Sequence, residues 1–413
     1  MAKPIITAID VGTHKVCALI AEVHDNNELE VLGVGIEPSR GVQKGAISNV
    51  DEASTAVANA VEQAERSSGL EIGAAFVSLA GAHVGAQNSR GVVGIGGSRA
   101  IEQADIDRAL EGAQAIPVPH NREVLHIIPR SFVVDGQDGI RSPLGMHGFR
   151  LEVEAHIISV IKTGLQNVLK CVENAGVAVE QVVINPLASA EVALTETERE
   201  MGVLVCDIGA GTMDIAIYIE GNVWHTAVLP VGGKLITADI AHGLRLPLEV
   251  AEAVKLEHGH ALASEVTRGS NFKVQPFGLV ESAQSVSQLE LAQIVQPRVE
   301  EIFELALQEI KRSGYDGMLS AGVVLTGGTA RLPGIRQLAS SVMQLPVRLV
   351  EPPQLRGLVD RISGPEFSTT VGLLHWAART VAMQPHKVEG GFFHWPQGVF
   401  ASAFGWVRNN LMP

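Results

Sequence analysis

The chain has 413 residues, 46% of them hydrophobic, so it is long enough to form more than one compact unit with a buried core. Its formal net charge is −14 and it has no long run of lysine or arginine, which argues against nucleic acid as the main partner. The three cysteines fit no zinc or redox spacing, and no stretch is long and apolar enough to span a bilayer. We therefore expect buried thiols in a reducing cytoplasm.

The first part of the chain alternates apolar strands with helices. Strands are expected at 5–9, 16–23 and 74–80, with a helix at 51–67. The block 84–162 then combines short apolar strands, one helix near 103–113 and many glycines and prolines, which indicates an inserted α/β subdomain.

The alternation resumes after the inserted block. A helix, a strand and a second helix are expected at 163–175, 182–185 and 186–194, and a new strand–turn–strand unit begins at Met201. The segment 234–305 is rich in helix signals and indicates a second insertion. The later elements are a helix at 297–313, a buried strand at 322–326 and a linker at 384–396.

Two distant strand–turn–strand units resemble each other. The first reads ITAIDVGTHKVCALIAEV from Ile6, and the second reads VLVCDIGAGTMDIAIYIEG from Val203. A single Asp-x-Gly turn is a common hairpin, but two in matched contexts favour a shared phosphate-binding role. The corresponding residues are Asp10 with Asp207, Gly12 with Gly209, and Thr13 with Thr212.

The residue types in these turns suit a magnesium nucleotide. Glycine lets the backbone approach a phosphate, a threonine hydroxyl can donate to its oxygens, and a strand-end aspartate can hold hydrated Mg²⁺. We expect Asp10 and Asp207 to face the metal through water. The remaining candidates in the two turns are Lys15, Gly211 and Asp214.

Further candidate sites lie in the second half. The strand before Gly327-Gly328-Thr329 ends in a glycine-rich loop against which a purine can lie flat. Gly232-Gly233 precedes a helix, a common place for an anion. Glu252 and Lys255 share a helix face, although an ordinary surface ion pair explains that spacing equally well.

These motifs, in this order, resemble the superfamily of actin, DnaK-type chaperones and sugar kinases. Its connecting helices correspond to those starting at Asn185-Pro186 and at 368–374, and its adenosine motif to 327–334. The resemblance implies an actin-like (ribonuclease H-like) two-domain α/β ATPase fold that closes on ATP and Mg²⁺. It also places Glu252 and Lys255 near the ribose and adenine.

Within the superfamily, the chain resembles the FtsA family of bacterial cell-division proteins. The inserted block, the segment 230–261 and an aromatic-rich C-terminal segment carry this resemblance. The parts it implies are a first core half (1–83 and 163–193), an inserted subdomain (84–162), a second core half (194–233 and 306–383), a second insertion (234–305), a linker (384–396) and a membrane-targeting amphipathic helix (397–413).

The expected C-terminal helix has a broad apolar face and one full positive charge, Arg408. Such a helix can lie in the lipid interface, with apolar burial supplying most of the binding. Docking of the same helix on the protein's own core is the alternative. The expected lipid-contacting residues are Val399, Phe400, Phe404, Trp406, Val407, Arg408 and Leu411.

The resemblance also implies function. It predicts filaments on the inner face of the cell membrane at the division septum, where they tether FtsZ through its C-terminal tail peptide and recruit later division proteins through 84–162. Arg298 is the candidate contact for that peptide, and Asn185, a poor base in a water-positioning place, predicts weak ATPase activity. A soluble small-molecule kinase and a related pilus-assembly ATPase remain alternatives.

Overall fold

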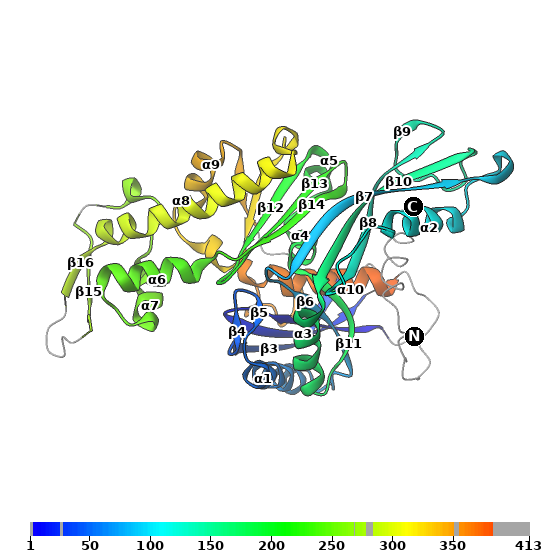
Figure 1. The fold of residues 1–413 in the computed structure, drawn as a ribbon. Helices are drawn as coiled ribbons and strands as arrows, with labels where there is room; N and C mark the ends of the chain where they lie inside the picture. The colour runs from blue at the N-terminus through cyan, green and yellow to red at the C-terminus, as the bar shows by residue number, and fades with distance from the viewer. Residues whose placement is uncertain (1–2, 25–27, 268, 278–283, 351–354, 383–413) are drawn as a thin grey trace.

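The computed structural model describes residues 3–24, 28–267, 269–277, 284–350 and 355–382. Two β-sheets lie one above the other with two helices between them, and a smaller domain projects at each end (Figure 1). The expected C-terminal helix lies outside the described residues. No helix within the described ranges combines the length and apolar character that crossing a bilayer requires.

Both faces of the first sheet are buried. In β2 (Lys15–Val23), Val16, Ala18 and Ile20 pack under the helices α1 (Val50–Ser68) and α3 (Lys162–Asn174). Cys17 and Leu19 of the same strand face the helices between the sheets. The sheet has the order β11 (Ala178–Ile184), β6 (Ala74–Leu79), β1 (Ile5–Val11), β2 (Lys15–Val23), β3 (Leu29–Pro38) and β19 (Arg356–Gly357). Beside it lie α1 (Val50–Ser68), α3 (Lys162–Asn174) and the hairpin of β4 (Val42–Gln43) and β5 (Ala46–Ile47).

The second sheet repeats the strand arrangement at the centre of the first. In both sheets an antiparallel hairpin, β1–β2 or β12–β13, carries the Asp-x-Gly turn and pairs in parallel with a further strand. The order is β14 (Asn222–Leu229), β13 (Met213–Ile219), β12 (Val203–Ile208), β17 (Gly322–Thr326) and β18 (Val347–Leu349). Helices α5 (Glu196–Met201) and α9 (Ile335–Met343) flank this sheet.

Two helices, α4 (Asn185–Ala193) and α10 (Ser368–Ala382), lie between the sheets. Helix α10 packs on β1, β2 and β6 of the first sheet, and α4 packs on β12 and β13 of the second. The end of the expected second half, 306–383, therefore returns to the first sheet, because β19 pairs with β3 and α10 follows it.

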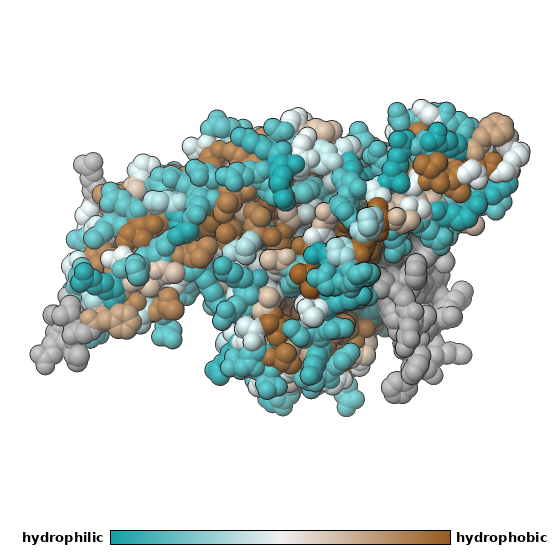
Figure 2. Space-filling view, in the orientation of Figure 1, coloured by the Kyte–Doolittle hydropathy of each residue, from teal (hydrophilic) through white to brown (hydrophobic). Residues whose placement is uncertain are grey.

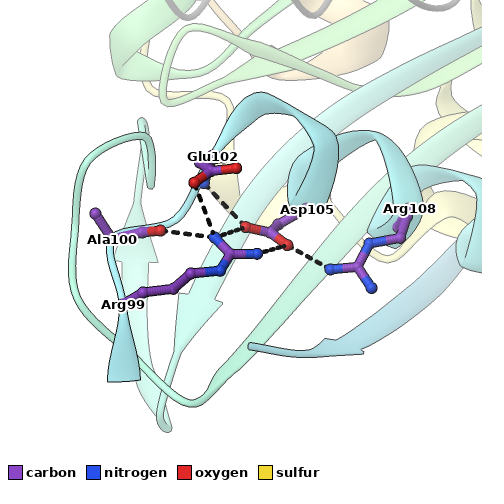
Figure 3. A network of polar contacts seen from close by, with 5 residues as sticks. All are labelled: Arg99, Ala100, Glu102, Asp105 and Arg108. Atoms are coloured by element: carbon purple, nitrogen blue, oxygen red, sulfur yellow. Dashed lines mark hydrogen bonds and ion pairs between the residues drawn. The ribbon is translucent and has the colours of Figure 1, made fainter. Parts of the chain in front are cut away.

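The inserted block folds as an antiparallel sheet with one helix on it. Its strand order is β7 (Val84–Gly94), β10 (Arg150–Ile161), β8 (Arg122–Val134) and β9 (Gln137–Ile140), covered by α2 (Gln103–Gln114). Asp105 fixes the start of α2. Its buried carboxylate accepts hydrogen bonds from Arg99 at 2.7 and 2.8 Å, from Arg108 and from the backbone N–H of Glu102 (Figure 3). Above all, the Arg99 guanidinium holds the pKa of Asp105 well below its usual range.

The second insertion is mainly helical. It comprises α6 (Gly233–Leu244), α7 (Leu248–His258), the hairpin of β15 (Asn271–Val274) and β16 (Gln284–Ser287), and α8 (Gln288–Ser313). Helix α8 starts earlier than the expected residue 297, so Pro297 lies inside it and the expected boundary at 305/306 cuts through it. The helix continues across the proline because Leu291, Val295 and Val299 form one buried face on both sides of it.

The crossing of α4 and α10 depends on a glycine. A Cβ built on Gly372 would overlap the carbonyl oxygen of Ala188, so a side chain there must push the helices apart. Since α4 and α10 each support a different sheet, this contact sets the spacing of the two halves.

We expect Gly372→Ala to lower the free energy of unfolding by about 1–3 kcal/mol through overpacking, despite the better helix propensity of alanine. Gly112→Ala in α2 is the matched control, because the nearest atom to its Cβ would lie 3.7 Å away. Thermal denaturation of both variants measures the effect. Equal melting temperatures for the two would contradict the tight crossing.

Candidate functional site

The first Asp-x-Gly turn joins β1 to β2. The N–H of Gly12 donates to the carbonyl oxygen of Lys15 at 3.0 Å and closes the turn. Asp10, buried at the end of β1, accepts a hydrogen bond from the Ser78 hydroxyl at 2.6 Å and from the Thr370 hydroxyl at 3.2 Å. Hydrogen bonds from β6 of the same sheet and from the first turn of α10 thus fix the orientation of the Asp10 carboxylate.

The second turn is built in the same way. The N–H of Gly209 donates to the carbonyl oxygen of Thr212 at 2.9 Å. Asp207 accepts from the Ser189 hydroxyl of α4 and, at 2.9 Å, from the Thr369 hydroxyl of α10. Two neighbouring threonines of one helix therefore hold the two equivalent aspartates, one in each half.

A third buried acid faces the second aspartate. Asp214 is the direct cross-strand partner of Asp207, and its Oδ2 accepts from the Thr212 hydroxyl at 3.1 Å. Burial raises the pKa of Asp207, and burial together with the charge of Asp207 raises the pKa of Asp214 well above its usual range.

Unused polar atoms remain at this cluster. Among the described residues, Asp214 Oδ1 and Asn185 Oδ1 are buried and have no hydrogen-bond partner. An orphaned carboxylate oxygen beside other carboxylates is costly unless a positive charge comes close. Carboxylate oxygens are ligands that Mg²⁺ prefers, so the predicted acids fit a hydrated magnesium ion.

Glycines let the loops around the acids approach one another closely. A Cβ on Gly211 would lie 2.7 Å from the Thr13 hydroxyl, one on Gly232 would lie 2.6 Å from the carbonyl oxygen of Gly209, and one on Gly233 would lie 2.6 Å from the Thr329 hydroxyl. Thr329 also donates to the Gly209 carbonyl oxygen at 3.0 Å. The structure thus brings both turns, the start of α6 and the loop at Gly327-Gly328-Thr329 together.

Lys234 is a cation that the sequence did not single out. Its ammonium group donates to the carbonyl oxygen of Thr13 at 3.0 Å, which links the second half to the first turn. Thr13 itself accepts from the N–H of Gly45 through its hydroxyl at 2.9 Å. The available signal was its place directly after Gly232-Gly233, at the start of α6.

Glu252 and Lys255 form more than a surface pair. Lys255 donates to Glu252 at 2.7 Å, to the Thr237 hydroxyl at 2.9 Å and to the carbonyl oxygen of Gly233 at 3.3 Å. Only 12% of the Lys255 side chain is exposed. The pair therefore ties α7 to the first turn of α6, next to the glycines of the site.

Two other predicted groups contact the segment before α10. Lys15 donates to the carbonyl oxygen of Glu366, and its ammonium group lies 4.5 Å from the centre of the Phe367 ring. Gly327, at φ 86°, donates through its N–H to the carbonyl oxygen of Pro365 at 3.2 Å. Gly328 follows in the same loop, beside the side chain of Glu366.

Arg298 lies apart from this cluster, in the interior of α8. Its Nε donates to Asp239 at 2.6 Å, its Nη2 donates to the other Asp239 oxygen at 3.1 Å, and its Nη1 contacts Glu301. The structure therefore places Arg298 within a helix, with its guanidinium paired to two acidic side chains. The predicted lipid-contacting residues lie outside the described part of the chain.

The family models and the individual proteins that match this chain agree with one another. The family model for cell division protein FtsA matches residues 204–372, and the model for the SHS2 domain inserted in FtsA matches residues 81–159. Cell division protein FtsA of Pseudomonas aeruginosa is 42% identical over 369 residues, covering 89% of this chain and 88% of that protein. FtsA of Neisseria meningitidis is 40% identical over 409 residues, covering 98% of each.

Solved structures share the fold at low identity. The PilM–PilN type IV pilus biogenesis complex matches with a TM-score of 0.65 and 16% identity, covering 90% of this chain and 98% of that one. MreB5 of Spiroplasma citri bound to ADP matches with a TM-score of 0.56 and 14% identity, covering 92% of this chain and 98% of that one. The MamK double helical filament matches with a TM-score of 0.53 and 14% identity, covering 90% of this chain and 98% of that one. The predicted actin-like two-domain fold with an inserted subdomain is thus confirmed. With relatives 40% or more identical along most of its length, this chain belongs to the FtsA family of cell division proteins.

Proposed function

We propose that this chain binds ATP and Mg²⁺ between its two halves and polymerises on the inner face of the cell membrane at the division septum. There it tethers FtsZ filaments and recruits later division proteins through its inserted subdomain. The observation that carries the nucleotide part is the matched pair of turns, each with a buried aspartate held by α10. Membership of the FtsA family favours this function over a soluble kinase or a pilus-assembly ATPase.

The grouping of buried acids, glycines and lysines at the two turns supports a nucleotide site there. Asp10, Asp207 and Asp214 supply carboxylates for hydrated Mg²⁺, whose charge offsets phosphate charge when the ion is bound. Backbone N–H groups of the glycine-rich turns and the ammonium groups of Lys15 and Lys234 offer donors to phosphate oxygens. MreB5, which shares the fold, was solved with ADP bound.

Turnover should be slow. Asn185, at the start of α4, presents a buried amide oxygen without a hydrogen-bond partner among the described residues. An amide oxygen can orient a water molecule but is too weak a base to take its proton. We therefore expect nucleotide binding mainly to regulate assembly.

Filament formation is supported by apolar surface at opposite ends of the molecule (Figure 2). The inserted subdomain exposes Val92 and Phe149, and the second insertion exposes Leu248, Leu256 and Phe277. Contiguous patches of exposed apolar side chains commonly mark protein interfaces. MamK, which shares the fold, was solved as a double helical filament.

Replacing Asp214 by Asn tests the nucleotide site. Burial raises the pKa of Asp214 in the folded state, so the free energy of unfolding falls as pH rises from the unfolded pKa to the folded pKa. A neutral Asn side chain carries no such loss. At neutral pH we expect a higher melting temperature than wild type without nucleotide. We expect ATP·Mg²⁺ to stabilise the variant less than it stabilises the wild type. In the wild type the added free energy of unfolding reaches about 2.7 kcal/mol when the nucleotide is in ~100-fold excess over its Kd.

Asp138→Asn, at an exposed position of β9, is the matched control. It should change neither the melting temperature without nucleotide nor the stabilisation by ATP·Mg²⁺. A lower nucleotide-free melting temperature for Asp214→Asn, with an undiminished gain from ATP·Mg²⁺, would count against this site.

Liposome co-sedimentation tests the membrane role. With ATP·Mg²⁺, the full chain should pellet with vesicles and carry FtsZ filaments with it, whereas a chain ending at Gln384 should stay in the supernatant. Phe404→Glu should reduce pelleting because a charge on the apolar face opposes burial in lipid, while Ser402→Glu is the control. Equal pelleting of the full and shortened chains would exclude the anchor.

The FtsZ contact can be tested at the Arg298–Asp239 pair. Charge reversal by Arg298→Glu should weaken binding of the FtsZ tail peptide about tenfold or more, because a charge-assisted hydrogen bond contributes ~1.5–3 kcal/mol. Asp239→Asn frees the Arg298 guanidinium and should strengthen binding. Titration of labelled peptide measures both, and an unchanged affinity in Arg298→Glu would remove Arg298 from the interface.

A further inference from the structure

The inserted subdomain is joined to one half of the protein and docked on the other. Its chain connections run from β6 into β7 and from β10 into α3, both elements of the first half. Its strands β7, β8 and β10 nevertheless contact β14, the edge strand of the second sheet (Figure 1).

A chain of hydrogen bonds crosses this contact. His156 on β10 pairs through Nδ1 with the Asn88 side-chain oxygen at 2.7 Å and through Nε2 with the Thr226 hydroxyl of β14 at 2.9 Å. Asn88 in turn donates to the Tyr315 hydroxyl at 3.2 Å. The two histidine partners fit a neutral ring that donates from Nδ1 and accepts at Nε2.

A buried arginine adds a second link. Arg130 on β8 is 8% exposed, and its guanidinium lies 4.1 Å from the centre of the Trp224 ring and 5.6 Å from that of Tyr315. The two rings meet edge to face at 5.3 Å. Both aromatic residues belong to the second half. If the subdomain moved away from it, the Arg130 guanidinium would lose the two ring faces that stabilise its charge.

The apolar core continues through the same contact. Ile128 and Ile158 of the inserted subdomain belong to one buried cluster with Val223 of β14 and Leu373 of α10. An ion pair between Arg141 and Glu200 of α5 joins the outer part of the subdomain to the second half. The subdomain is therefore held to the second half along its length.

The two halves meet again at the phosphate turns, through the Lys234–Thr13 hydrogen bond and the close approach of Gly211 to Thr13. A ligand that changes the spacing of these turns must also move β14 relative to the first half. The inserted subdomain, linked to both halves, has to respond.

We infer that a docking surface makes the orientation of the inserted subdomain depend on the spacing of the two Asp-x-Gly turns. This inference rests on the proposed nucleotide binding. The surface consists of Asn88, Arg130 and His156 on the inserted subdomain and Trp224, Thr226 and Tyr315 on the second half.

Distance measurement between two labels on the full chain tests the coupling. The native cysteines Cys17, Cys171 and Cys206 are buried, so labels attach to introduced cysteines at Asp138 on β9 and Glu52 on α1. We expect ATP·Mg²⁺ to shift the label distance. The shift should be lost in the double variant Arg130→Met, Thr226→Val, and diminished in the milder Thr226→Val, which removes one hydrogen bond.

Arg336→Met on exposed α9 is the control for loss of a positive charge and should keep the full shift. Binding of a fluorescent ATP analogue, measured on the same samples, separates the outcomes. No binding by wild type overturns the nucleotide site and the coupling with it. Binding without a distance shift overturns the coupling alone, and a full shift in variants that bind overturns the role of the docking surface.

Discussion

The structure depends on the way α10 holds two buried aspartates that belong to different sheets. Thr370 donates to Asp10 and its neighbour Thr369 donates to Asp207, so one helical turn aligns the acids of both halves. The alignment requires α10 to pass close to α4, and Gly372 permits that passage. Acid placement, helix crossing and spacing of the halves are therefore one constraint.

This arrangement carries a cost in the absence of a ligand. Asp214 faces Asp207 directly across the β12–β13 ladder, and burial raises the pKa of both. Hydroxyl donors offset part of that cost, but Asp214 Oδ1 lacks a partner among the described residues. Functional sites commonly keep such unfavourable groups because a bound cation or substrate completes them.

The two strand–turn–strand units were predictable because their pattern is local: an aspartate, a glycine and a hydroxyl residue stand within one turn between apolar strands. Thr369 and Thr370 were not assigned a role, since their partners lie far away in the chain and nothing nearby marks them. The start of α8 was misplaced because Pro297 suggests a first helical residue, whereas tertiary burial of the preceding turns overrides that signal. The Arg298–Asp239 ion pair could not be predicted locally, because Asp239 belongs to another helix.

The docking of the inserted subdomain belongs to the same class of long-range feature. His156 and Arg130 sit in strands that read as ordinary apolar segments, and their partners Thr226 and Trp224 come from an edge strand of the other half. Such a contact cannot be inferred from local pattern, because only the fold brings the strands together. A subdomain that is attached to one half and packed on the other must either change its orientation or lose contacts when the two halves move relative to each other. The insertion is thus placed where a change in the spacing of the two Asp-x-Gly turns can reach the outer surface of the molecule.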